Sequence, residues 1–139
     1  MSPMLSVLLA LLFVPGPIEA KVVRVLDGDT VEVKARPWVD LEVTTFVRVA
    51  GIDTPEKGWR AKCPAERELG ERASLLAQKL MPLGATLRLL EVQKGKYAGR
   101  VVASVILPDG RDYASILIDE GLAYPYEGKT KRSFCEERP

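Results

Sequence analysis

Three side chains that suit phosphate chemistry lie close together in residues 46–56. Arg48 carries a permanently charged guanidinium, and Asp53 and Glu56 stand three positions apart across a Thr-Pro turn. Two carboxylates at this spacing can share one hard cation or one water molecule. Because the chain contains no histidine, a general base in this segment would have to be a carboxylate. The combination indicates a site that handles phosphate esters.

The segments on the N-terminal side of this cluster predict a β-hairpin. Residues 21–26 and 31–34 both alternate toward β-branched side chains and are joined by an Asp-Gly dipeptide, a frequent hairpin turn. Asp27 and Gly28 suit the turn itself. Asp29 follows the dipeptide at a position where a strand favours an apolar residue, so we assign it a role beyond the turn.

The remaining pattern predicts a single α+β domain. Strands are expected over 41–52, 85–92 and 101–107, a connection over 36–40, a long helix over 64–80 and a short helix over 114–120. The long helix has one apolar stripe, and we interpret its charged face, which includes Glu66, as solvent-exposed. Five strands with a long helix inserted before the fourth predict a sheet that curls into a small barrel.

The first twenty residues have the order of a secretory signal. An apolar run over 4–14 is followed by Pro-Gly-Pro and then by residues 18–20, which suit a cleavage site. The run is too short to span a bilayer. We expect a signal peptide over 1–20, a mature domain over 21–139 and a secreted or periplasmic protein, anchored to the membrane if the segment is not cleaved. A buried N-terminal extension is the alternative.

Cys63 and Cys135 are the only cysteines, and the net charge is +1. An even pair of cysteines in a chain expected to be exported favours a disulfide, with two unrelated free thiols as the alternative. Neither thiol suits a nucleophile, because no histidine is present to activate it. The small net charge means that an anionic partner would be bound by a local patch.

Three motifs together resemble the staphylococcal nuclease (thermonuclease) family. They are Asp-Gly-Asp-Thr at 27–30, Ile-Asp-Thr-Pro-Glu at 52–56 and Lys-Tyr-Ala-Gly-Arg at 96–100. The resemblance extends over about residues 21–126. It implies a five-stranded OB-fold-type barrel with helices, and a phosphodiesterase that cleaves DNA or RNA with calcium and leaves 3′-phosphate products. We expect the protein to be a monomer.

The resemblance also implies roles for individual residues. Asp29 and Asp53 match the calcium-binding carboxylates, and Thr54 matches the residue whose main-chain carbonyl completes the protein ligands. Glu56 matches the carboxylate that acts as general base or orients the attacking water. These assignments agree with the preference of calcium for an all-oxygen shell.

Two arginines match the groups that hold the scissile phosphate in this family, Arg48 and Arg100. Planar guanidinium donors suit phosphate oxygens. Lys96 and Tyr97 are candidates for contact with nucleic acid by charge and by stacking, with a solvated loop as the alternative. Ala98 makes this loop one residue longer than the family pattern.

Two rival functions follow from the same residues. One is a noncatalytic OB-fold module that binds nucleic acid or protein. The other is an exported structural domain whose carboxylates cap turns. The complete set of carboxylates and arginines favours the nuclease.

Overall fold

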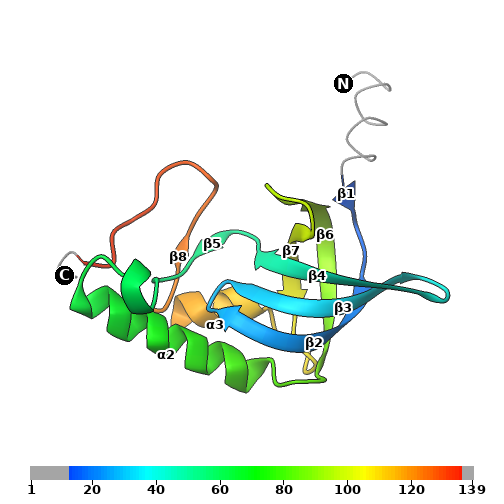
Figure 1. Cartoon of the computed structure of the whole chain (residues 1–139), viewed down its shortest axis with the longest axis horizontal. Coiled ribbons are helices and arrows are strands. Elements are labelled where there is room, and N and C mark those ends of the chain that lie inside the picture. Colours follow the sequence, from blue (N-terminus) through cyan, green and yellow to red (C-terminus); the bar gives the residue numbers. More distant parts are fainter. Residues whose placement is uncertain (1–12, 136–139) are drawn as a thin grey trace.

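The computed structural model describes residues 13–135. Its strands are β1 (Phe13–Val14), β2 (Ile18–Asp27), β3 (Thr30–Trp38), β4 (Leu41–Val49), β5 (Ile52–Asp53), β6 (Thr86–Lys94), β7 (Arg100–Ile106) and β8 (Tyr124–Pro125). Its helices are α2 (Pro64–Leu80), α3 (Tyr113–Asp119) and the 3-10 turn η1 (Gly58–Arg60). Helix α2 runs along one side of the strands (Figure 1). The predicted α+β class is confirmed.

The main sheet closes on itself. Its strands follow the order β1-β6-β2-β3-β4-β7, and β6 also pairs with β7. Strands β4 and β7 are parallel, whereas β2–β3, β3–β4 and β6–β7 are antiparallel. A closed barrel leaves no long free edge among its strands. The predicted five-stranded OB-type barrel is therefore confirmed.

Strand β2 begins earlier than the sequence pattern predicts. Residues 18–20 belong to it and pair with β6, residues 19 and 20 also pair with β3, and Ala20 is 1% exposed. The expected signal peptide over 1–20 therefore overlaps the strand. Residues 1–12 lie outside the described part of the chain, so the signal peptide stays a prediction.

The turn between β2 and β3 differs from the prediction. Asp27 pairs with Thr30, so Gly28 and Asp29 are the central turn residues, and Asp29 lies within the turn rather than after it. Gly28 does not have a positive φ. A Cβ there would lie 3.0 Å from the Cβ of Ala73 and 3.1 Å from the Cβ of Thr54. Close approach to neighbouring segments, rather than backbone conformation, favours glycine at this position.

Two further boundaries were wrong. The expected connection over 36–40 is mostly strand, because β3 continues to Trp38. The expected strand over 41–52 is divided into β4 and β5 by Gly51, which has a φ of 81°. The bend turns β5 away from the barrel to pair with β8, and this places Asp53 beyond the end of β4.

Helix α2 begins where its sequence predicts. Cys63 is the N-cap, and Pro64 occupies the first turn, where its missing N–H costs nothing. The interpretation of the whole charged face as solvent-exposed is wrong for Glu66, which is 7% exposed. Among the described residues, no helix is long and apolar enough to cross a membrane.

Candidate active site

The turn between β2 and β3 is fixed against two other elements. The Val49 N–H donates to the Asp29 carbonyl at 2.8 Å, which joins the turn to the end of β4. The hydroxyl of Tyr113, a fully buried residue at the start of α3, donates to the Gly28 carbonyl at 2.6 Å. Both bonds hold Asp29 beside the end of β4.

Arg48 lies between the two predicted metal-binding carboxylates. Its Nη2 atom is 3.5 Å from Asp29 Oδ2 and 4.0 Å from Asp53 Oδ1. Its Nη1 atom donates to the Val49 carbonyl at 3.0 Å. The three side chains are 16%, 14% and 9% exposed, respectively. The guanidinium is thus held in one place by its own strand while it faces both carboxylates.

A third aspartate, Asp27, belongs to this cluster. Asp27 Oδ1 accepts a hydrogen bond from the Asp29 N–H at 3.1 Å. Burial, followed by the negative charge of Asp29, raises the pKa of Asp27 to about 7. Burial also acts to raise the pKa of Asp29, but the Arg48 charge and hydrogen bonds from Asp27 and Thr30 outweigh it, so the pKa of Asp29 is lowered. Of the two carboxyls, Asp27 is therefore the one that holds a proton as the pH falls below about 7 in the calcium-free protein.

Glu56 faces the same cluster from the loop after β5. Burial, and then the negative charge of Asp29, raise the pKa of Glu56, while the charges of Arg60 and Lys131 act to lower it. Burial likewise raises the pKa of Asp53, against the opposing charge of Lys131. These carboxylates form a concentration of negative charge that a bound cation would relieve.

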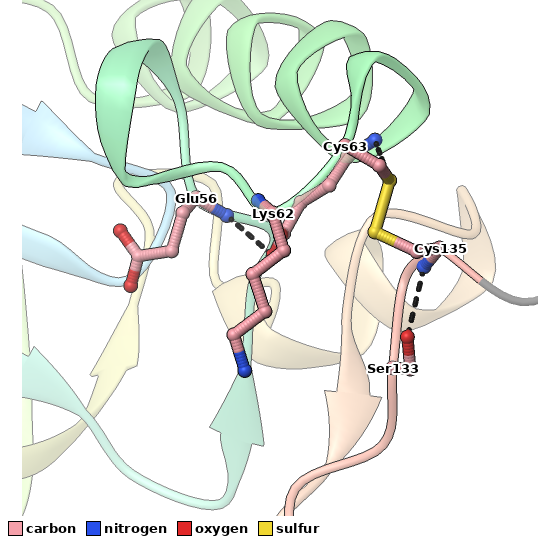
Figure 2. The surroundings of a disulfide bond; sticks show 6 residues. Glu56, Lys62, Cys63, Ser133 and Cys135 are labelled. Atoms are coloured by element: carbon pink, nitrogen blue, oxygen red, sulfur yellow. Dashed lines mark hydrogen bonds between the residues drawn. A yellow bond between two sulfur atoms is a disulfide. The ribbon is translucent and has the colours of Figure 1, made fainter.

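Helix α2 positions the main chain of Glu56. The Glu66 carboxylate accepts from the Glu56 N–H at 3.2 Å and from the Lys62 N–H at 2.8 Å. A Cβ at Gly70 would lie 2.3 Å from the Glu56 carbonyl oxygen, so the loop packs directly on the helix. In Figure 2 the Glu56 carboxylate points away from this support.

The two predicted phosphate-binding arginines lie on one face of neighbouring strands. The parallel register sets Phe46 opposite Arg100 and Arg48 opposite Val102. Side chains two positions apart on a strand share a face. Both arginines line a cleft of about 620 Å³ beside the carboxylate cluster, together with the following cationic and aromatic side chains: Lys96, Tyr97, Tyr126 and Lys131.

The geometry is compatible with a metal site, but the protein side chains alone do not complete the coordination shell. Within residues 13–135, no group of three or more Asp, Glu, His or Cys side chains converges closely enough to hold a metal ion. Asp29 and Asp53 both approach one guanidinium nitrogen and are both largely buried. Two carboxylates with a main-chain carbonyl and several waters suit calcium, which takes six to eight oxygen ligands. The residues present therefore fit a partly hydrated calcium ion.

Residues 46–138 match the family described as "Staphylococcal nuclease homologue". The chain belongs to the staphylococcal nuclease family. Two relatives named "Uncharacterized endonuclease", from Escherichia coli and Escherichia coli O157:H7, are each 34% identical to the chain over 110 residues. The aligned region covers 79% of this chain and 62% of each relative, so the chain spans less than two thirds of their length.

The staphylococcal nuclease fold brings most of the predicted residues together. One cluster is formed by Asp29, Arg48, Asp53 and Glu56. Arg100 lines the adjoining cleft. Thr54 is 4% exposed beside the cluster. Lys96 and Tyr97 line the cleft rather than the cluster; their contact with nucleic acid stays a prediction.

The cysteine pair is bonded in the structure. The sulfur atoms of Cys63 and Cys135 are 2.08 Å apart, and the residues are separated by 72 positions. Figure 2 shows this bond on the stretch that also carries Glu56 and Lys62. It ties the C-terminal tail to the start of α2.

Sequence reasoning missed four residues of this site. Asp27 was assigned to turn geometry alone, and Glu66 was assigned to a solvated face. The spacing of Cys63 and Glu66, an N-cap followed by glutamate at the third helical position, is a capping signal that could have identified Glu66. Gly70 and Lys131 act through contacts distant in sequence, and no local signal marks them.

Proposed function

We propose that the chain is a calcium-dependent nuclease that hydrolyses phosphodiester bonds of DNA or RNA. The observation that carries this proposal is the position of Arg48, which faces two buried carboxylates and also lines a cleft rich in cationic side chains. A phosphate in the cleft would therefore lie beside the carboxylates. Family membership and the endonuclease name of the relatives support the same activity.

The cleft suits a nucleic-acid strand. Arg48, Arg100 and Lys96 would contact phosphate oxygens, and Tyr97, which is 66% exposed, would stack on a base. Stacking on an aromatic ring tolerates any base. We therefore expect binding with little sequence preference.

Asp29 and Asp53, with the main-chain carbonyl of Thr54, would hold the calcium ion. When bound, calcium would stabilise the negative charge that gathers on the phosphate oxygens during hydrolysis. Asp27 would support the site because its side chain accepts a hydrogen bond from the Asp29 N–H. The hydrogen bond from Tyr113 to Gly28 would keep this turn in place.

Glu56 would take a proton from the attacking water. Its raised pKa, caused first by burial, makes the carboxylate a stronger base than an exposed glutamate. Glu66 and Gly70 fix the main chain of Glu56, so the carboxylate starts from a defined position. A preorganised base needs no rearrangement in the transition state.

Arg48 and Arg100 would hold the scissile phosphate and stabilise its added charge. Both lie on the same face of β4 and β7, so two planar donor groups can approach one phosphate. Donors positioned before the reaction contribute to rate by preorganised electrostatics. A lysine could not reproduce the two-donor contact.

We also propose that the protein is secreted or periplasmic, on the basis of its N-terminal sequence and cysteine pair, and that it acts as a monomer. The rival function, a noncatalytic OB-fold module, predicts nucleic-acid binding without cleavage. The test is to incubate single-stranded DNA with the purified chain in calcium and in chelator, and to measure its melting temperature under both conditions. Calcium-dependent cleavage supports the nuclease. A calcium-dependent rise in melting temperature without cleavage would favour the binding module.

A further inference from the structure

The C-terminal tail folds back over the candidate active site. It leaves β8 at Pro125 and returns to the start of α2, where Cys135 is bonded to Cys63. Figure 1 shows this arch of the tail toward the N-terminal end of α2. Cys63 follows Glu56 by only seven positions, so the anchor point lies next to the catalytic loop.

Aromatic contacts hold the tail in this position. The rings of Tyr124 and Phe134 stack with their centroids 4.6 Å apart, and Phe134 is 5% exposed. The Arg132 guanidinium lies 4.2 Å from the centroid of the Tyr124 ring. The end of the tail is thus both covalently fixed and packed, although most of its intervening residues are exposed.

Lys131 is a tail residue whose side chain contacts the carboxylate cluster. Its Nζ atom is 3.5 Å from Asp53 Oδ1 and 5.6 Å from the centroid of the Tyr126 ring. The same side chain lines the cleft that contains Arg48 and Arg100. Lys131 is 57% exposed, whereas Asp53 is 9% exposed, so the lysine can exchange partners while the carboxylate stays fixed.

We propose that Lys131 is a further phosphate-binding side chain of this site, in addition to Arg48, Arg100 and Lys96, and that the Cys63–Cys135 disulfide holds it there. In the free protein it serves as a counter-ion for Asp53. When a nucleic-acid strand enters the cleft, Lys131 contacts a backbone phosphate. This inference rests on the proposed nuclease function and adds a substrate-positioning residue to it.

Removing Lys131 should have opposite effects on the two ligands. Calcium binding in the absence of nucleic acid should tighten by about two- to fivefold, because a partly exposed ion pair no longer competes for Asp53. Nucleic-acid binding should weaken, and the slope of log affinity against log salt should decrease in magnitude by about 0.7 for the loss of one contact to a single strand. If Lys131 had only a structural role, its removal would not tighten calcium binding while reducing the salt slope of nucleic-acid binding.

The test compares Lys131→Ala with Lys129→Ala, an exposed lysine of the same tail. Both are made in a Glu56→Gln background to prevent cleavage. Calcium affinity is measured by calorimetry, and binding of a short oligothymidylate is measured across a range of salt concentrations. The proposal predicts both changes for Lys131→Ala and neither for Lys129→Ala. An unchanged salt slope in Lys131→Ala would overturn it.

A second comparison tests the role of the disulfide. The double substitution Cys63→Ser and Cys135→Ser leaves a serine that can still cap α2, and circular dichroism checks its fold. It should reproduce the smaller salt slope of Lys131→Ala, and an unchanged slope in a folded double variant would refute the tethering role. If the parent protein binds neither calcium nor oligothymidylate, the proposed function itself fails. If the parent binds both and Lys131→Ala binds them as the parent does, only the role of Lys131 fails.

Discussion

Gly70 gives a sharp test of how the Glu56 loop is positioned. A Cβ at residue 70 would lie 2.3 Å from the Glu56 carbonyl oxygen, 2.5 Å from its carbonyl carbon and 2.9 Å from the Lys57 nitrogen. All three are main-chain atoms, so a side-chain rotation cannot relieve the overlap. In Gly70→Ala the Glu56 main chain would have to move by about 1 Å, and a misplacement of this size costs about 10²-fold in rate.

The same substitution should change stability much less than activity. Alanine is favoured over glycine within a helix by about 1 kcal/mol, whereas overpacking typically costs about 1–3 kcal/mol. The two terms partly cancel, so we expect Gly70→Ala to lose between about 0 and 2 kcal/mol of unfolding free energy. The fold would remain while the loop that carries Glu56 shifts.

The assay measures kcat and KM for calcium-dependent cleavage of single-stranded DNA, together with urea denaturation. Glu71→Ala, an exposed position on the same helix, is the matched control and should retain both activity and stability. A Gly70→Ala variant with the parental kcat would show that contact with α2 does not position Glu56, and the reasoning would be refuted.

Three further outcomes follow from the site. Arg100→Lys should lower kcat by about 10²-fold because a single ammonium cannot replace a two-donor fork; near-parental turnover in a cleavage assay would remove Arg100 from the site. Reduction of the bond between Cys63 and Cys135 should lower the unfolding free energy by about 2–4 kcal/mol, seen as a lower melting temperature in reductant, and an unchanged melting temperature would contradict it. The pKa of Asp27 is raised from 3.8 to about 7, so the folded, calcium-free protein holds this proton more tightly than the unfolded chain. The resulting stabilisation is fully present below pH 3.8 and is lost as pH rises through about 7. Asp27→Asn should flatten the dependence of unfolding free energy on pH in this range, measured by urea denaturation at several pH values. An unaltered pH dependence would count against the raised pKa of Asp27.

The barrel and the centre of the site were predictable because their signals are local. Arg48, Asp53 and Glu56 occur within one strand and the turn after it, so their proximity follows from sequence spacing. Arg100 came from the family resemblance alone. Its approach to Arg48 depends on the parallel pairing of β4 with β7, and periodicity within one sequence does not specify which strands pair.

The supporting residues were missed for a different reason. Glu66 belongs to a run of charged helical residues. Its place three positions after the N-cap is a capping signal, but the burial of its carboxylate comes from the packing of the 56–62 loop on α2. Lys131 resembles any lysine of a polar tail until the disulfide and the ring stack determine the path of the tail. Gly28 was assigned to a turn because local rules consider backbone conformation and not the approach of Ala73.

The central claim is that Glu56 acts as the base in a calcium-dependent hydrolysis. It is tested most directly by comparing cleavage of single-stranded DNA by the parent protein and by Glu56→Gln, with calcium binding of both measured by titration. We predict that Glu56→Gln binds calcium and DNA but loses about 10²-fold or more in kcat. Equal turnover by the two proteins at equal calcium occupancy would contradict the account.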